Sequence, residues 1–359
     1  MKIESKIKNY SVEKIEKVLS KKEDILKNIK FRRVYFFIDE NVFNIYKKSL
    51  KKIVKDDQYL IIPADETNKE YIKLADYYKW LIDEEFMRTD ILITIGGGIL
   101  QDISGFIAST LYRGIKWIFI PTTLLSQADS CIGSKTSINF KGNKNLIGSF
   151  YPPDRIFIDP AFCHTLSDEY FNSGIGEIIK FHLLSDMKGY EKLKDYIFSK
   201  DLKNEDRLFE MIISTLKIKK SYFDEDEFDT GRRNLLNYGH CFGHALESAS
   251  NYAICHGEAV LLGMAFADLL SLKRKILSQE VYDEFQKIYY NHYPDFNIKE
   301  ISSGQIIKYL KKDKKRIGKY LTMVISKGVG NFEKLDDIKD SEIKNIYRRF
   351  ISDYLQRVD

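Results

Sequence analysis

Five short apolar runs alternate with helical patterns in the first 160 residues of the chain. The runs lie at residues 33–38, 59–62, 90–95, 116–120 and 155–158. Because each run is almost continuously apolar, the pattern predicts strands of a parallel sheet that is covered on both faces. The helical patterns near 68–84 and 99–110 predict the crossover helices that join such strands.

The pattern changes after Pro160. Helical periodicity dominates from Ser167 to Leu310, and a single apolar stretch at 320–325 predicts one late strand. The fold class that follows is an α/β N-terminal nucleotide-binding domain plus a mostly α-helical C-terminal domain, with boundaries at 1–160 and 161–359. A length of 359 residues agrees with two domains.

Composition narrows the class of protein. The 57 Lys and Arg and 52 Asp and Glu leave a net charge of +5, which is small for this length and indicates no nucleic-acid partner. No apolar run reaches the ~18–20 residues that a membrane span needs. The charged N-terminus lacks an apolar signal core. The four Cys form no CxxC pair, so we expect a cytoplasmic protein without a disulfide framework.

A run of three glycines, Gly96 to Gly98, follows the third apolar run and precedes a helical pattern. Such a turn lets backbone N–H groups approach a pyrophosphate at a helix N-terminus, although a simple tight turn explains it equally well. Asp39 ends the first apolar run. Its carboxylate fits either a ribose hydroxyl or the cap of the next helix, and the sequence does not decide between these interpretations.

Three of the six histidines, His240, His244 and His256, lie within seventeen positions. A helix places His240 and His244 on one face, and His256 starts the next helical pattern. Imidazoles from two neighbouring helices and one carboxylate make a divalent-metal site with an open position, and Glu177 in an otherwise apolar helix is the candidate carboxylate. The alternative is that these are buried structural histidines. HExxH is absent, which disfavours a zincin protease.

Several cations stand in polar, glycine-containing surroundings. Lys135 follows Gly133 and Ser134, but the P-loop pattern is not met, and Lys219, Arg232 and Arg233 come later. Each is either a solvated surface residue or part of a group that binds an acidic, phosphorylated substrate.

Four stretches, at 96–106, 121–148, 174–180 and 219–264, together resemble the 3-dehydroquinate synthase family of sugar-phosphate cyclases. The resemblance runs in order from about Asp39 to Lys315. It implies an NAD-binding α/β domain and a helical domain with the active site between them. It also implies conversion of 3-deoxy-D-arabino-heptulosonate 7-phosphate to 3-dehydroquinate and phosphate, with NAD and Zn²⁺ (or Co²⁺) as cofactors.

The resemblance also implies roles for individual residues. The metal ligands are Glu177, His240 and His256, which makes His244 an active-site partner instead of a ligand. The other active-site positions are Asp129, Lys135, Asn145, Lys180, Lys219, Arg233, Asn237, Lys314 and the phosphate contact Arg113, which is often shared across a homodimer. The NAD-binding positions are Asp39, Glu66, Lys69, Gly97, Gly98, Asp102, Thr122, Thr123, Lys144, Phe162 and Thr165.

The chain departs from the family pattern at several positions. Ser134 and Ser137 stand where the family usually has glycine, Cys131 where serine is common, and Asp229 where glutamate is usual. The first forty residues lack the family's glycine-containing hairpin. His164, His182 and His292 have no assigned role.

Three alternatives therefore stay open. The first is a cyclase of sedoheptulose 7-phosphate or an amino analogue, although Lys219 and Asn237 match the dehydroquinate-forming pattern. The second is a metal-dependent polyol dehydrogenase of the iron-alcohol-dehydrogenase group, whose members commonly carry Asp where this chain has Glu177. The third is a non-catalytic relative.

Overall fold

The computed structural model describes residues 1–54, 58–311 and 320–358. The chain divides into two compact units, Met1–Leu166 and Ser167–Asp359. The predicted domain boundary at residue 160 falls at the start of the short helix η5 (Pro160–Thr165). No described helix is long and apolar enough to cross a membrane.

The N-terminal unit is built on a seven-stranded sheet with the order β1-β2-β9-β6-β5-β3-β4. All neighbouring pairs except β1–β2 are parallel. The elements are β1 (Lys2–Ile3), β2 (Tyr10–Lys14), α1 (Lys22–Leu26), β3 (Val34–Asp39), α2 (Glu40–Ile53), β4 (Tyr59–Ile62), η2 (Glu66–Lys69), α3 (Tyr71–Asp83), β5 (Ile91–Gly96), α4 (Gly98–Thr110), η3 (Leu111–Arg113), β6 (Lys116–Pro121), η4 (Ser126–Ser130), β7 (Lys135–Phe140), β8 (Asn143–Phe150) and β9 (Arg155–Ile158).

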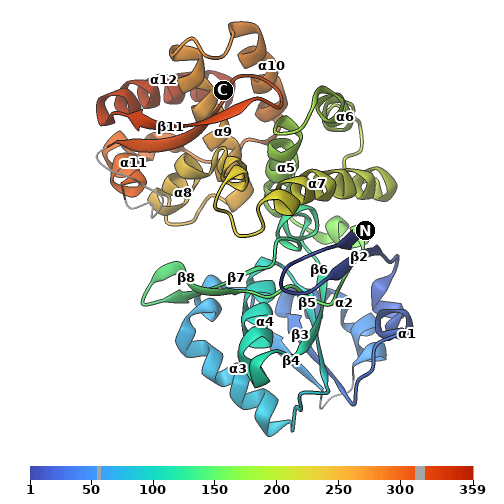
Figure 1. Cartoon of the computed structure of the whole chain (residues 1–359). Helices are drawn as coiled ribbons and strands as arrows, with labels where there is room; N and C mark the ends of the chain where they lie inside the picture. The colour runs from blue at the N-terminus through green and yellow to red at the C-terminus, as the bar shows by residue number, and fades with distance from the viewer. Residues whose placement is uncertain (55–57, 312–319, 359) are drawn as a thin grey trace. The chain divides into compact units, whose positions relative to one another are not determined.

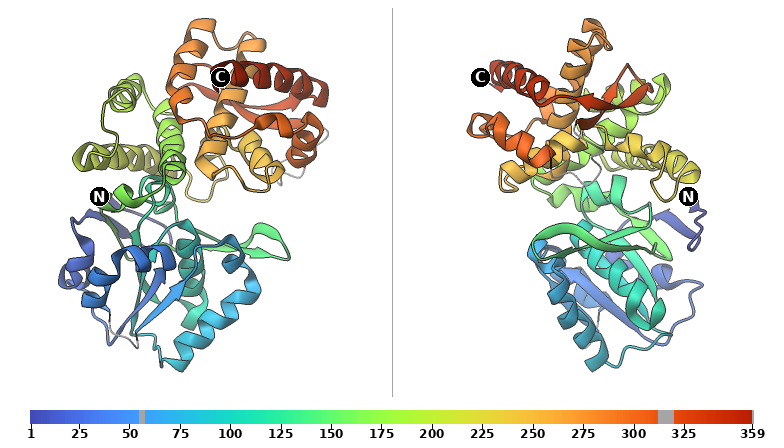
Figure 2. Two further views of the ribbon diagram at one scale, coloured as in Figure 1. Left: turned by 180° about the vertical axis from the view of Figure 1, so that it is seen from behind. Right: turned by 60° about the vertical axis from the view of Figure 1, so that its left-hand side comes forward.

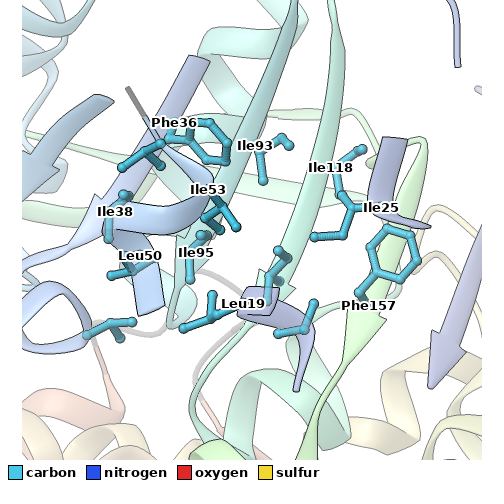
Figure 3. Close-up of a cluster of buried hydrophobic side chains, with 14 of the residues drawn as sticks. Leu19, Ile25, Phe36, Ile38, Leu50, Ile53, Ile93, Ile95, Ile118 and Phe157 are labelled. Atoms are coloured by element: carbon cyan, nitrogen blue, oxygen red, sulfur yellow. The ribbon is translucent and has the colours of Figure 1, made fainter. Parts of the chain in front are cut away.

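Helices cover both faces of this sheet, as its continuously apolar strands predict (Figure 1). On one face, Phe36, Ile93 and Ile118 pack against Leu50 and Ile53 of α2 (Figure 3). On the other face, Tyr35 and Phe37 contact the Trp80 ring of α3. The central strands β3, β5 and β6 therefore bury both of their faces, and the predicted strands and crossover helices are confirmed.

Two hairpins were not predicted from the apolar pattern. β7 and β8 pair antiparallel as a separate ribbon (green in Figure 2), and most of β8 is partly or fully exposed. At the N-terminus β1 and β2 pair antiparallel although residues 1–40 contain no glycine. An N-terminal hairpin therefore forms in this chain without a glycine.

The described part of the C-terminal unit is mostly helical and contains the antiparallel hairpin β10–β11. The predicted late strand is β10, whereas β11 was not predicted. The mostly helical unit confirms the predicted fold class. Its elements are α5 (Asp168–Leu183), α6 (Met187–Ile197), α7 (Glu205–Glu225), η6 (Arg232–Asn237), α8 (His240–Ala249), α9 (His256–Lys273), α10 (Gln279–Tyr289), α11 (Ser303–Leu310), β10 (Leu321–Ser326), β11 (Phe332–Ile338) and α12 (Asp340–Val358).

Helix α9 is the centre of the C-terminal unit, because it is apolar and buried nearly all round. Glycines let its neighbours approach to backbone contact. A Cβ on Gly257 would lie 1.7 Å from the carbonyl oxygen of Ser173 in α5. Gly239, with φ of +78°, caps the start of α8, and its Cβ would lie 2.5 Å from the Val260 carbonyl oxygen. These contacts fix α5 and α8 against α9.

Replacement of Gly257 should therefore be costly. We expect Gly257→Ala to lower the free energy of unfolding by about 3 kcal/mol or more, because α5 must move away from α9. Gly304→Ala is the control, since its Cβ would meet only Ser302 Oγ at 3.8 Å. Urea unfolding measures both variants, and equal stabilities would contradict the proposed close packing.

Candidate active site

In the N-terminal unit, the carboxyl ends of three neighbouring strands meet at one edge of the sheet. Ile38 pairs with Ile95 and Gly96 pairs with Pro121, so Asp39, Gly97 and Thr122 lie at the same edge. The strand order reverses between β3 and β5, because β4 lies outside β3 while β6 and β9 lie beyond β5. Open α/β sheets bind ligands outside the carboxyl ends of their strands at such a reversal.

Asp39 caps helix α2 at this edge. Its Oδ1 accepts hydrogen bonds from the backbone N–H of Asn41 at 2.8 Å and of Val42 at 3.4 Å. Burial raises the pKa of Asp39, and these two bonds oppose the rise. The helix-cap interpretation is confirmed, and the contact to a ribose stays a prediction. Gly97 is likewise the N-cap of α4, so the glycine turn opens a helix as expected.

The hydrogen-bonded residues around Lys69 form the polar centre of this unit. The Lys69 ammonium is almost completely buried and lies 2.8 Å from Asp102 Oδ2, 2.9 Å from Asn145 Oδ1 and 3.6 Å from Glu66 Oε1. Lys144 Nζ lies 3.9 Å from the other Glu66 oxygen. Five predicted site residues from η2, α4 and β8 are thus brought together.

Ser137 completes this group, although the sequence marked it only as a departure from the family pattern. Its backbone N–H donates to Asp102 Oδ1 at 2.9 Å. Its hydroxyl lies 2.9 Å from Asp102 Oδ2 and 2.8 Å from Asn145 Oδ1, so it donates to one of them at a time. A glycine at this position would keep the backbone bond and lose the hydroxyl contacts.

The other predicted residues of this unit lie apart from the Lys69 group. Phe162 packs in the hydrophobic core, and Thr165 Oγ1 lies 3.1 Å from the Tyr46 hydroxyl. Asp129 lies in η4 and Lys135 begins β7. Arg113 is exposed on η3, at the opposite end of α4 from Gly98 and just before β6 begins. Within its own chain, Arg113 therefore lies at the opposite edge of the sheet from Asp39.

The C-terminal unit gathers three histidines and one carboxylate from three helices, α5, α8 and α9. The ring nitrogens of His240, His244 and His256 lie within 4.8 Å of one another. Glu177 of α5 is completely buried, and its Oε1 lies 3.7 Å from His240 Nε2 and 3.6 Å from His256 Nε2. The expected residues from α5, α8 and α9 are therefore brought together.

The spacing of these atoms fits a metal ion better than direct hydrogen bonds. Distances of 3.6 and 3.7 Å are too long for hydrogen bonds. Two ligand atoms of a tetrahedral Zn²⁺ lie about 3.4 Å apart, given metal–ligand distances of about 2.0–2.1 Å. Among the described residues, neither Glu177 oxygen accepts a hydrogen bond, although Oε2 forms an ion pair with Lys180. The arrangement suits a divalent cation bound by Glu177, His240 and His256.

The two histidines of this arrangement are oriented by different partners. His240 Nδ1 lies 3.2 Å from the Tyr238 carbonyl oxygen, which leaves Nε2 facing Glu177. Burial, followed by the nearby Lys180, lowers the pKa of His240 well below its usual value, as a neutral ligand requires. Burial also lowers the pKa of His256, but Glu247 and Glu177 outweigh burial and raise it to about 9. The sequence analysis did not identify Glu247.

Three buried cations extend the site along α5, α7 and η6. Lys180 and Lys219 both face the Phe181 ring, with their Nζ atoms 4.5 and 5.9 Å from its centroid. Arg233 lies 5.5 Å from the Phe223 ring and donates to the Glu227 carbonyl oxygen. All three cations are at least nine-tenths buried. Asn237, also in η6, donates to the Asn234 carbonyl oxygen at 2.8 Å. Lys314 lies outside the described residues.

His182 and His292, which had no predicted role, are buried away from this arrangement. His182 Nδ1 lies 2.8 Å from the Ile178 carbonyl oxygen and Nε2 lies 3.0 Å from the Ser214 hydroxyl. His292 Nδ1 lies 3.1 Å from Asn172 Oδ1. Burial lowers the pKa of each imidazole to about 4, so both rings are neutral in the folded protein at neutral pH.

This burial predicts acid sensitivity. Below a pH of about 6.5 the unfolded chain protonates His182 but the folded chain does not, so stability falls as the pH drops toward about 4. His182→Gln should remove about 2 kcal/mol of the stability lost between pH 8 and pH 5. Denaturant unfolding at both pH values measures this difference. Parallel curves for wild type and His182→Gln would contradict a neutral imidazole in the folded protein.

The fold and the arrangement of groups define a class of protein: an α/β unit followed by a helical unit that carries a carboxylate–histidine cluster. Family models confirm it, because the 3-dehydroquinate synthase N-terminal model matches residues 59–173 and the C-terminal model matches residues 174–316. This chain belongs to the 3-dehydroquinate synthase family. The prediction of an enzyme of the carbon–oxygen lyase type is thereby confirmed.

Individual relatives agree with the family. The chain is 34% identical to 3-dehydroquinate synthase of Streptococcus equi subsp. equi (strain 4047) over 92% of this chain and 93% of the relative. It is 38% identical to 3-dehydroquinate synthase of Dictyoglomus turgidum (strain DSM 6724 / Z-1310) over 85% of each chain. A solved 2-deoxy-scyllo-inosose synthase, in complex with carbaglucose-6-phosphate, NAD⁺ and Co²⁺, shares the fold. Its TM-score is 0.87 at 23% identity, over 97% of this chain and 99% of that one.

Proposed function

We propose that the chain is an NAD- and divalent-metal-dependent 3-dehydroquinate synthase. It would convert 3-deoxy-D-arabino-heptulosonate 7-phosphate to 3-dehydroquinate with elimination of phosphate, a step of the shikimate pathway. One observation carries the proposal: a completely buried Glu177 carboxylate lies beside two imidazole nitrogens and the Lys180 ammonium. Relatives with this activity match most of the chain.

Two cofactors fit the two units. Glu177, His240 and His256 would hold Zn²⁺ or Co²⁺, because one carboxylate and two imidazoles suit these ions, and His256 would release its proton on metal binding. Asp39, Gly97 and the other predicted residues of the N-terminal unit would bind NAD, since the N-terminus of α4 offers backbone N–H groups to a pyrophosphate. When bound, NAD⁺ supplies reversible hydride acceptance and the metal ion supplies Lewis acidity at a substrate hydroxyl.

The residues of the C-terminal unit bind and orient an anionic substrate in this proposal. Lys180, Lys219 and Arg233 offer three positive charges that are already held in place by buried partners. A phosphorylated sugar acid carries the opposite charge, so these side chains would fix its anionic groups. The remaining proposed active-site residues are Asp129, Lys135, Asn145, Asn237, His244 and, outside the described residues, Lys314.

The proposal includes a homodimer. Arg113 is the expected phosphate contact, yet in its own chain it lies at the opposite edge of the sheet from the proposed NAD site. A second copy of the chain would have to supply that contact.

A cyclase for a different sugar phosphate is the second candidate. It is favoured by the TM-score of 0.87 with 2-deoxy-scyllo-inosose synthase, which binds carbaglucose-6-phosphate. The sequence identity of 33–38% to several 3-dehydroquinate synthases favours the first candidate. A polyol dehydrogenase explains the three buried cations less well, because its substrates carry no phosphate.

A phosphate-release assay with NAD⁺ and Zn²⁺ tests the substrate. We expect release with 3-deoxy-D-arabino-heptulosonate 7-phosphate, no release with sedoheptulose 7-phosphate or glucose 6-phosphate, and a product with the mass of 3-dehydroquinate. NADH should not accumulate, because the hydride is returned in each turnover. Release with another sugar phosphate alone would select the second candidate, and NADH accumulation with glycerol without phosphate release would select a dehydrogenase.

Zinc binding tests the ligand assignment. We expect His256→Ala to lose Zn²⁺ binding, because one of three protein ligands is gone, while His244→Ala keeps it. The two histidines make a matched pair, since both belong to the same cluster but only His256 lies within 4 Å of Glu177 among the described contacts. Competition with a chromophoric chelator measures both variants. Loss of binding in His244→Ala with retention in His256→Ala would overturn the assignment.

A further inference from the structure

Glu247 contacts the proposed metal ligand His256, and the sequence assigned no role to it. It follows His240 by seven residues and His244 by three on α8, so the three side chains share one face of that helix. Its carboxylate is mostly buried, and one oxygen, Oε2, contacts two imidazoles. This oxygen lies 3.4 Å from His256 Nδ1, within hydrogen-bond reach, and 4.0 Å from His244 Nε2.

The two nitrogens of His256 face different carboxylates. Nδ1 faces Glu247, whereas Nε2 lies 3.6 Å from Glu177 Oε1. A neutral imidazole carries one N–H, and a carboxylate accepts but does not donate. If Nδ1 holds the hydrogen and donates it to Glu247, then the Nε2 lone pair points toward Glu177 and His240. This is the tautomer in which Nε2 can bind a cation.

The other proposed histidine ligand reaches the same tautomer with a different partner. His240 Nδ1 donates to the Tyr238 carbonyl oxygen, which is neutral and is part of the backbone immediately before α8. His256 begins α9 and has a charged side chain as its partner. The orientation of His256 therefore depends on a single replaceable residue, whereas the orientation of His240 does not.

We propose that Glu247 is a positioning residue that fixes the ring of His256 with its Nε2 directed at the metal site. The inference rests on the proposed assignment of Glu177, His240 and His256 as metal ligands. Partners behind a ligating histidine fix its tautomer and raise its basicity, and their removal typically lowers metal affinity by about 10–100-fold. Glu247 also contacts His244, so it joins a ligand to a neighbouring imidazole that we do not assign as a ligand.

Zn²⁺ affinity of the purified full-length protein tests the inference without recourse to activity. Competition with a chromophoric chelator should show an affinity about 10–100-fold weaker for Glu247→Ala, and an intermediate loss for Glu247→Gln, whose amide oxygen still accepts a hydrogen bond. Glu342→Gln is the control, because its carboxylate is also partly buried and hydrogen-bonded, to Arg274 at the C-terminal end of α9. It should bind Zn²⁺ as the wild type does.

Two further readouts separate positioning from a general loss of structure. The metal-free melting temperature and the NAD⁺ affinity of Glu247→Ala should match the wild type. The visible absorption of the Co²⁺-loaded protein should change in band position or intensity, because the geometry at Co²⁺ changes. An unchanged Zn²⁺ affinity and Co²⁺ spectrum in Glu247→Ala would overturn the inference, as would a weaker affinity explained by a lower metal-free melting temperature.

His256→Ala distinguishes this inference from the proposed function. If His256→Ala loses Zn²⁺ binding and Glu247→Ala keeps the wild-type Zn²⁺ affinity, the ligand assignment is supported and the proposed role of Glu247 is wrong. If His256→Ala binds Zn²⁺ as tightly as the wild type, the ligand assignment fails and the role of Glu247 fails with it.

Discussion

The complete burial of the Glu177 carboxylate is the constraint on which the C-terminal site depends. A buried charge without partners costs several kcal/mol, so a sequence that places a glutamate in the apolar middle of α5 must also supply positive charge around it. Lys180 supplies one such charge. The two imidazole nitrogens lie 3.6 and 3.7 Å from Glu177 Oε1. They are too far away to donate hydrogen bonds to it, but their spacing is close to that between two ligand atoms of one metal ion. In the proposed metal site, a divalent cation between the carboxylate and these nitrogens would complete the compensation.

In the N-terminal unit, too, a buried charge is surrounded by groups of opposite polarity, but here the buried charge is positive. There the buried group is the Lys69 ammonium, and Asp102, Glu66 and Asn145 surround it with acceptors. Ser137 then ties Asp102 to Asn145, so residues from η2, α4 and the β7–β8 hairpin hold one another in place. Polar networks of this kind are stable only when every member is satisfied, which makes the hairpin part of the site.

The features predicted correctly from the sequence are those that depend on residues close together in the chain. Continuous apolar runs identified the parallel strands, and four-residue spacing placed His240 and His244 on one helix face. The β7–β8 hairpin was missed because its exposed strand lacks an apolar pattern. The histidine spacing predicted a cluster of three imidazoles with Glu177 as the candidate carboxylate, but it did not show which imidazoles the carboxylate faces. Glu177 lies beside His240 and His256 because Gly257 lets α5 approach α9, a contact between residues far apart in the chain. Glu247 was missed for the related reason that its partner His256 begins another helix.

The buried cations follow from the same packing. Lys180 and Lys219 come from different helices but share the Phe181 ring, and Arg233 is held over Phe223, one helical turn beyond Lys219. An aromatic face attracts a cation without neutralising it, although the Lys180 charge also compensates the Glu177 carboxylate. Groups that are already oriented need no reorganisation when an anionic substrate binds, and this pre-organisation is where electrostatic catalysis gains most. In the proposed substrate site, the aromatic side chains beneath these cations would therefore hold the cations in position for the substrate.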